Sequence, residues 1–269
     1  SPVSYSVSDR RVPDWVDDRQ QHGRYTFTKE EMITELNVGE KAAEKALRRL
    51  LEKNRLARPW RTFYVVVPLE YRSVGAPPPS WYVDDLMVFL ERSYYVGVLT
   101  AAGLHGAAHQ RAQEFQIVAD EPASTRTVGR SRLRFFTKKN TRESATEERQ
   151  TETGSMRVST PEQTAVDLLR YVHGAGHLEN VTTVLSELGG SLRGKKLVEV
   201  AEHEELSNLQ RLGFLLESLG YEEIGGHLHE WIERQEPSRV SLKKGGARDS
   251  STLNGRWNLY VNSEISVTG

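Results

Sequence analysis

A short proline-rich segment constrains the fold of this chain more than any other feature. Residues 75–80 read GAPPPS, and three consecutive prolines can neither continue a helix nor donate hydrogen bonds inside a sheet. Roughly 75 residues precede this segment and roughly 190 follow it, and each length is sufficient for a core of its own. We therefore predict a first domain at residues 1–76, a linker at 77–80 and a second domain at 81–269.

The residues before this segment carry the signals of helices followed by a strand pair. Residues 13–21 favour a short helix, and Thr28 with Glu31 forms a capping box that should open a second one. A four-residue connection leads into a third helix over residues 40–54, and the β-branched and aromatic run at 62–67 is typical of a strand. This order is the layout of a winged helix-turn-helix.

The third helix has an apolar side and a charged side. Ala43, Leu47 and Leu50 recur at helical spacing, so the basic residues face away from the core, where a helix in the major groove would meet bases and phosphates. A basic turn around Trp60 lies where a wing would touch the DNA backbone. The candidate DNA-binding residues are Thr28, Lys29, Lys41, Glu44, Lys45, Arg48, Arg49, Arg58, Trp60 and Arg61. The alternative is a charged exterior used for contacts with protein.

The two halves of the chain differ in charge, although the whole chain has a net charge of only −1. Residues 1–142 contain 23 Lys/Arg and 17 Asp/Glu, whereas residues 143–269 contain 13 and 20, a balance of −7. The basic excess lies in two runs, at 45–61 and 126–142, and such runs indicate either a polyanion binder or a solvated face. The acidic half should point away from DNA and could receive a partner.

The second basic run has the pattern of strand, turn and strand. Arg130, Arg132 and Arg134 occupy alternate positions, so we expect them to share one face of a half-buried sheet. Aligned guanidinium groups suit phosphate oxygens, while an exposed polar sheet face or a surface for a protein partner is the alternative. The residues assigned to this second basic face are Arg126, Arg130, Arg132, Arg134, Lys138 and Lys139.

Little in the sequence indicates catalysis or a bound metal. The chain has no cysteine, so a metal would need histidines and carboxylates. His105 and His109, like His173 and His177, are four residues apart, but neither pair carries the glutamate of a metalloprotease motif. We predict no enzyme, no catalytic residue, no cofactor and no metal, with a metal-dependent enzyme built on the His pairs as a distant alternative.

The remaining expectations concern location and the acidic half. No run of about 18 uncharged apolar residues is present, and the N-terminus lacks a secretory pattern, so we expect a cytoplasmic protein. Residues 160–163 should open a helix with a Thr-to-Gln capping box. Asp167 in that helix either pairs with a neighbouring basic side chain or faces water. Residues 195–231 should be helical with a stop at Gly220, and residues 255–262 should form a strand. The fold class is mixed α and β: residues 81–190 carry the basic sheet face, and residues 191–269 form an acidic helical region with a final strand.

Several short segments carry a family resemblance through their order and spacing. They are TKEE (28–31), ALRRL (46–50), RL (55–56), FYVVVPLEYR (63–72), GAPPP (75–79), WYVDDLM (81–87), YYVG (94–97), AAGLHGAAHQ (101–110), FQIV (115–118), TG (153–154) and RVSTPEQTAVDL (157–168). Through these segments, residues 25–190 resemble the AbiEi antitoxins, the regulator half of type IV toxin–antitoxin pairs of abortive infection.

The resemblance implies functions that periodicity and charge do not. It implies a winged helix that represses its own operon by binding inverted repeats, and a C-terminal antitoxin domain that counteracts a nucleotidyltransferase-like toxin. The implied partners are double-stranded DNA and the cognate toxin, the latter without the need for a stable complex, and no membrane. The chain would be a monomer in solution with two copies on the operator. The alternative is a protein-interaction module that neutralises the toxin by direct binding, with the winged helix not used on DNA.

Overall fold

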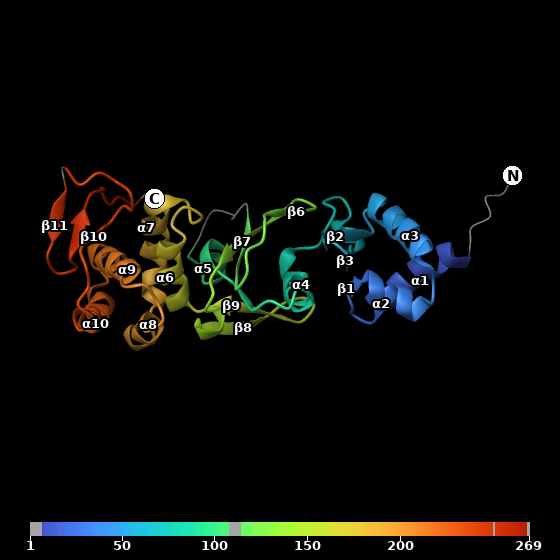
Figure 1. The fold of residues 1–269 in the computed structure, drawn as a ribbon, viewed down its shortest axis with the longest axis horizontal. Coiled ribbons are helices and arrows are strands. Elements are labelled where there is room, and N and C mark those ends of the chain that lie inside the picture. Colours follow the sequence, from blue (N-terminus) through green and yellow to red (C-terminus); the bar gives the residue numbers. More distant parts are fainter. Residues whose placement is uncertain (1–6, 108–113, 250, 268–269) are drawn as a thin grey trace.

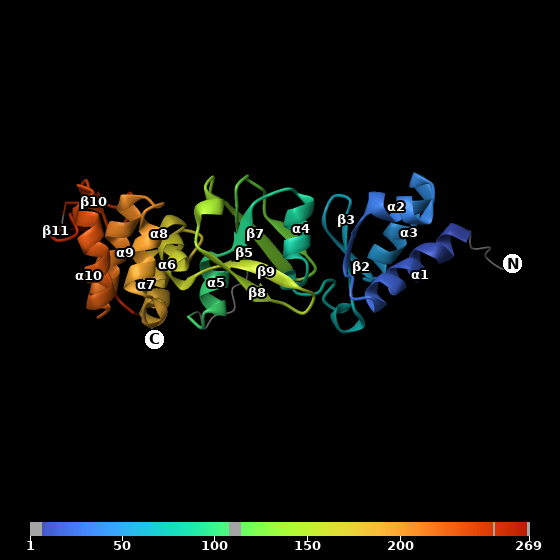
Figure 2. The ribbon, with the colours of Figure 1, turned by 90° about the horizontal axis from the view of Figure 1, so that it is seen from below.

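The chain folds into three parts that follow one another along its longest axis (Figure 1). The computed structural model describes residues 7–107, 114–249 and 251–267, and these combine helices and strands, which confirms the mixed α and β fold class. The N-terminal part, in blue, lies at one end, the largest sheet lies in the middle, and helices with a small sheet form the other end. A view from below shows the same order (Figure 2).

The N-terminal part consists of three helices and an antiparallel sheet with strand order β1-β3-β2. Its elements are α1 (Val7–Gln21), β1 (Thr26–Thr28), α2 (Lys29–Leu36), α3 (Glu40–Glu52), β2 (Leu56–Trp60) and β3 (Phe63–Val66). Helix α1 begins six residues before the expected start, and Pro13 lies inside it. Because Val12 and Val16 are buried in the N-terminal core, packing stabilises this helix despite the missing N–H of the proline.

The start and the end of α2 follow the sequence closely. The Thr28 hydroxyl accepts a hydrogen bond from the Glu31 amide at 3.1 Å, and the Glu31 carboxylate accepts one from the Thr28 amide at 3.4 Å. The predicted capping box is therefore confirmed. Asn37 adopts a left-handed conformation with φ of 50° and ends the helix, so only three residues separate α2 from α3.

The middle part is a six-stranded sheet with two helices, and its strand order is β6-β7-β5-β4-β9-β8. Its elements are α4 (Val83–Phe89), β4 (Tyr94–Val96), α5 (Val98–Leu104), β5 (Phe115–Ala119), β6 (Arg126–Val128), β7 (Ser131–Thr137), β8 (Thr146–Gln150) and β9 (Ser155–Ser159). Tyr94 and Val96 pack with α4, whereas Tyr95 between them packs with the C-terminal helices. Since successive side chains of a strand point to opposite faces, one face contacts α4 and the N-terminal part, and the other contacts the C-terminal helices.

The proline-rich segment lies within a hydrophobic cluster shared by the first two parts. Ala76 is 6% exposed, and it packs in one cluster with Phe63 of β3 and Leu133 of β7. Gly129, in the turn between β6 and β7, has a φ of +59°, and a Cβ there would lie 2.5 Å from the carbonyl oxygen of Val74. This close approach requires glycine. The segment is thus packed rather than an exposed tether, and a division of the chain into separate domains at residues 77–80 stays a prediction.

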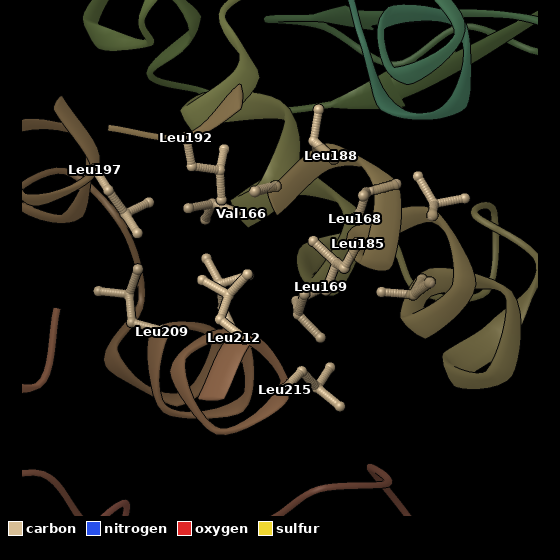
Figure 3. Close-up of a cluster of buried hydrophobic side chains, with 14 of the residues drawn as sticks. Val166, Leu168, Leu169, Leu185, Leu188, Leu192, Leu197, Leu209, Leu212 and Leu215 are labelled. Carbon is tan, nitrogen blue, oxygen red and sulfur yellow. The ribbon is translucent and has the colours of Figure 1, made fainter. Parts of the chain in front are cut away.

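The C-terminal part is a bundle of helices with a small sheet of strand order β10-β12-β11. Its elements are α6 (Pro161–Arg170), α7 (His177–Leu188), α8 (Gly194–Ala201), α9 (Leu206–Ser218), α10 (Glu222–Glu233), β10 (Val240–Ser241), β11 (Thr252–Asn254) and β12 (Leu259–Val261). Leucines from several of these helices point toward one another in the core, including Leu168 of α6, Leu185 of α7 and Leu212 of α9 (Figure 3).

Two expectations for this part need correction. The region expected to be helical over residues 195–231 contains three helices, because a further break separates α8 from α9; the stop expected at Gly220, which has a φ of +92°, is confirmed at the end of α9. The strand expected over residues 255–262 is confirmed only for Leu259–Val261, because the residues before it form a turn. Trp257 lies in that turn and is 1% exposed, so the apolar alternation arises from a buried turn and a short strand together.

Candidate nucleic-acid interface

Helix α3 presents a row of cations to solvent. Lys41, Lys45 and Arg48 are exposed and are spaced by four and three residues, so they share one side of the helix. The opposite side is buried, with Leu47 1% exposed and Leu50 3% exposed in the N-terminal core. Arg49 lies at the border and is half-buried. The arrangement places ammonium and guanidinium groups where an anionic partner can approach α3.

Three candidate contacts have partners within the protein. Lys29 Nζ donates to Glu44 Oε1 at 2.7 Å and to Glu40 Oε1 at 3.1 Å, which ties the start of α2 to α3. The hydrogen bonds to Glu44 and then Glu40 raise the pKa of Lys29, and the bond to Lys29 lowers the pKa of Glu44. The Thr28 hydroxyl caps α2. These contacts join α2 to α3, and the predicted contacts of the same residues with DNA stay a prediction.

The β2–β3 hairpin carries two exposed arginines beside a docked tryptophan. Arg58 and Arg61 are exposed. Trp60 lies between them, and the guanidinium carbon of Arg126 is 3.4 Å from its ring centroid, while Phe135 packs edge-on at 6.1 Å. Trp60 therefore joins the hairpin to the central sheet, and a DNA contact of this ring would have to replace that packing.

The predicted second basic face does not exist as one surface. Arg126 is in register with Leu133, so its side chain lies on the face that packs against the N-terminal part. Arg132 is in register with Thr127 and lies on the opposite face. The assignment of Arg126 to the same face as the other arginines is wrong, because the strand directs its side chain toward the hairpin.

Only part of the run keeps the expected arrangement. The side chains of Arg132 and Arg134 share a face of β7 and are 59% and 37% exposed. Glu114 lies 3.8 Å from Arg132 and 3.4 Å from Arg134, so their charge is partly compensated. Arg130 lies in the β6–β7 turn and Lys139 follows the end of β7, and both are exposed.

Lys138 is buried, so its assignment to an exposed basic face is wrong. Its Nζ donates to Glu204 Oε1 at 2.5 Å and lies 3.8 Å from Asp167 Oδ1, and all three side chains are at most 1% exposed. The Tyr95 hydroxyl donates to Asp167 Oδ2 at 2.6 Å, and the Gln163 amide donates to Asp167 at 3.2 Å and to Glu204 at 2.9 Å. We call these five residues the Lys138 cluster.

The Lys138 cluster joins the end of β7 to α6 and to the loop before α9. Burial raises the pKa of Asp167 to about 6, although the charge of Lys138 acts in the opposite direction. Burial also raises the pKa of Tyr95 well above its usual range. The cluster also explains why only half of the predicted capping box at residues 160–163 forms. The Thr160 hydroxyl accepts a hydrogen bond from the backbone N–H of Gln163 at 3.3 Å, but the Gln163 side chain donates to Glu204 instead of accepting from the helix start. This buried arrangement is structural, because none of its charges reaches solvent.

The histidine pairs have different surroundings. His105 Nε2 lies 2.8 Å from the carbonyl oxygen of Ser159, and His109 lies outside the described residues. The Nδ1 atoms of His173 and His177 are 3.1 Å apart. Within residues 7–107, 114–249 and 251–267, no three His, Asp or Glu side chains come close enough together to hold a metal ion.

A comparison with known families bears on the middle of the chain. The family described as the AbiEi antitoxin C-terminal domain matches residues 95–218. Residues 95–218 belong to the AbiEi antitoxin family. This match confirms the resemblance found in the sequence and supports an antitoxin of a toxin–antitoxin system. No curated protein matches this chain.

A solved structure supports the fold over nearly the whole chain. The crystal structure of the RV2827C protein from Mycobacterium tuberculosis matches with a TM-score of 0.64, and the match covers 96% of this chain and 92% of that chain. Only 14% of the aligned residues are identical, so this likeness describes the fold alone.

The AbiEi match does not include the cationic helix. It begins at Tyr95 in β4 and ends at Ser218, the last residue of α9. The AbiEi domain thus contains the Lys138 cluster and most of the central sheet, whereas α3 and the β2–β3 hairpin precede it. No helix in the described part of the AbiEi chain combines the length and the hydropathy needed to span a bilayer.

Proposed function

We propose that this AbiEi antitoxin binds double-stranded DNA through a winged helix-turn-helix formed by its N-terminal part, and that it represses its own operon. The observation that carries the proposal is the exposed row of Lys41, Lys45 and Arg48 on α3, opposite a buried apolar side. A helix with this polarity fits the major groove, where side chains near its start reach base edges and flanking phosphates.

The hairpin extends this surface in the manner of a wing. Arg58 and Arg61 are exposed at the β2–β3 hairpin, and Thr62, with a φ of 65°, forms its turn. Both arginines can reach phosphate oxygens beside the groove that α3 occupies. Trp60 holds the hairpin against the central sheet, so the wing and α3 would approach DNA as one body.

In this proposal a different part of the chain, the AbiEi domain, is responsible for the antitoxin activity. The AbiEi domain supports toxin neutralisation, and we assign a nucleotidyltransferase-like toxin as the partner and an inverted repeat in the promoter as the DNA site, with two copies of the chain on one repeat. Residues 143–269, which carry 13 basic and 20 acidic side chains, would face away from the duplex.

Salt dependence tests the DNA proposal directly. Binding of the full chain to a fluorescent duplex with the inverted repeat of its own promoter is measured by anisotropy between about 50 and 200 mM salt. If five cations, namely Lys41, Lys45, Arg48, Arg58 and Arg61, neutralise phosphates, log K should fall against log salt with a slope of about −4.5. A flat response contradicts the proposal.

Paired variants locate the DNA-binding surface. The double variant Lys45→Ala with Arg48→Ala should weaken binding by about 1–3 kcal/mol for each base-reading side chain that it removes. The matched control is Lys195→Ala with Lys196→Ala, which removes two exposed cations from α8 and should change binding little. Equal effects of both would mean that α3 is not the DNA-reading element, and no effect of either would favour a winged helix that binds protein.

A further inference from the structure

A cavity in the C-terminal part lies far from α3 and has the size of a small-molecule site. It has a volume of about 440 Å³ and lies between the end of α6, the start of α7, α9 and the segment after β10. Figure 1 shows α7, α9 and β10 toward one end of the molecule and α3 near the other. The cavity is therefore separate from the proposed DNA surface.

Positive charge is concentrated in this cavity although the surrounding half of the chain is acidic. Six lining side chains are basic and one is a carboxylate. The basic ones are Arg170, His173, His177, Arg211, Lys243 and Lys244, and the carboxylate is Glu205. Arg170 also pairs with Glu204 at 3.8 Å. They come from α6, the turn before α7, α7, α9 and the loop after β10, so apart from the four-residue spacing of the two histidines no local spacing in the sequence indicates them. A basic pocket in a region with an excess of seven acids points to an anionic ligand.

Arg211 is fixed in the cavity by neutral hydrogen-bond partners. Its Nε donates to the carbonyl oxygen of Ser241 at 2.9 Å, and its Nη1 donates to Asn208 Oδ1 at 3.2 Å. No ion pair within 4.0 Å forms between Arg211 and a carboxylate of the described residues, although Glu205 attracts it at longer range, and burial lowers the pKa of its guanidinium. A half-buried, oriented guanidinium with neutral partners retains its charge for a ligand.

The other cations surround Arg211 from two sides. Lys243 and Lys244 are exposed, and neither side chain forms an ion pair within the described residues. Across the cavity, His173 and His177 face each other at 3.1 Å, and His177 has a φ of 69°, which is unusual for a residue with a side chain. The turn before α7 and the first residue of α7 thus bring two imidazoles to the same cavity as the lysines.

An apolar wall completes the cavity. Leu169, Val172, Leu178 and Leu242 line it together with Tyr171. The Tyr171 hydroxyl donates to the carbonyl oxygen of Thr137 at 2.9 Å, which fixes the ring. A polyphosphate would use only the cationic side, whereas a nucleoside phosphate would use both, with its base against the apolar wall and its phosphates near Arg211 and the lysines.

We propose that this cavity binds a nucleoside triphosphate. The phosphates lie against Arg211, Lys243 and Lys244, and the base lies against Tyr171 and its apolar neighbours. This ligand site is independent of the proposed DNA contact through α3, so either one can fail without the other.

Calorimetric titration of the full chain tests the site, with ATP, tripolyphosphate and adenosine as probes. ATP should bind more tightly than either of the other two, because only ATP offers both halves of the ligand. The variant Lys243→Gln with Lys244→Gln, which changes two exposed side chains, should weaken ATP binding about tenfold or more, because charge-assisted hydrogen bonds to the phosphates are removed. The control Lys45→Gln with Arg48→Gln on α3 removes the same charge and should leave ATP binding unchanged.

Several outcomes would overturn the proposal. Absence of ATP binding up to about 1 mM, where affinity falls below that of most specific sites, would remove it. Equal weakening by both double variants would show that ATP responds to net charge rather than to the cavity. Tripolyphosphate that binds as tightly as ATP would remove the nucleoside from the assignment, and adenosine that binds as tightly would remove the phosphates.

Discussion

The two basic runs of this AbiEi antitoxin, at residues 45–61 and 126–142, differ in how the fold exposes their side chains. On α3 the cations at positions 41, 45 and 48 all reach solvent on one side of a helix. Along β6 and β7, Arg126 covers Trp60, Arg132 and Arg134 lie on the other sheet face beside Glu114, and Lys138 is buried. Similar clusters of charge in the sequence thus become one exposed row in one region, and a mixture of structural contacts and separate exposed side chains in the other.

The difference arises from what covers each element. Helix α3 lies at the outside of the N-terminal part, so one side is buried and the whole opposite side stays exposed. The central sheet is covered on both faces, by α4 and the N-terminal part on one and by the C-terminal helices on the other. A charge on such a strand must pair, stack or lie near an edge. Charge density alone therefore predicts a binding surface only where one side of the element is free.

Replacement of Lys138 by Met should give the largest effect. The substitution leaves the carboxylates of Asp167 and Glu204 buried without their cation, and breaking a buried pair in this way costs about 3–5 kcal/mol of unfolding free energy. Urea denaturation measures it. Lys139→Met is the matched control, because Lys139 is exposed, and should stay within about 0.5 kcal/mol. Similar values for the two would mean that Lys138 is solvated.

The next effect is a pH dependence caused by Asp167. Its pKa is about 6 in the folded chain against an ordinary 3.8, so the folded state binds its proton more tightly than the unfolded state. Stability from this group is complete below about pH 4 and is lost as the pH rises through 6, by about 3 kcal/mol. Asp167→Asn should remove that slope in denaturation curves taken between pH 4 and 7.

A matched variant checks this pH dependence. Asp249 is exposed, so Asp249→Asn should leave the slope of the natural chain unchanged. A slope that persists in Asp167→Asn would place the titrating group elsewhere in the molecule.

Replacement of Trp60 by Ala should give the smallest of the three effects. Removal of the half-buried ring leaves Arg126 and Phe135 without their packing partner, at a cost of about 1–3 kcal/mol, and Trp60→Phe should recover part of it. Arg61→Ala, one residue away and exposed, should leave thermal stability nearly unchanged but weaken DNA binding. If Trp60→Ala instead abolishes DNA binding at unchanged stability, the hairpin tryptophan contacts DNA and not the sheet.

Local signals in the sequence predict the N-terminal elements well. The capping box at Thr28 and Glu31, the break after α2 and the hairpin that ends before Pro68 each depend on residues close together in the chain, and the structure confirms them. The segments of the AbiEi resemblance also lie in a fixed order along the chain. Such features need no knowledge of what packs against them.

The remaining features depend on partners far away in the sequence. Lys138 meets Glu204 across 66 positions, and Gln163 leaves its expected capping role for the same pair. The cavity around Arg211 gathers cations from four segments. Alternation on β7 correctly separates Arg132 and Arg134 from Leu133, but it cannot reveal which face another part of the chain covers.

The shared packing of Ala76, Phe63 and Leu133 fixes the orientation of α3 relative to the central sheet. If two copies bind one inverted repeat, the distance between their two α3 helices is then set by the packing within each chain and not by a flexible linker. Insertion of a few base pairs between the half-sites would rotate one copy around the duplex axis. Because no flexible linker could compensate for this rotation, the spacing of the half-sites would be as strict a requirement as their sequence.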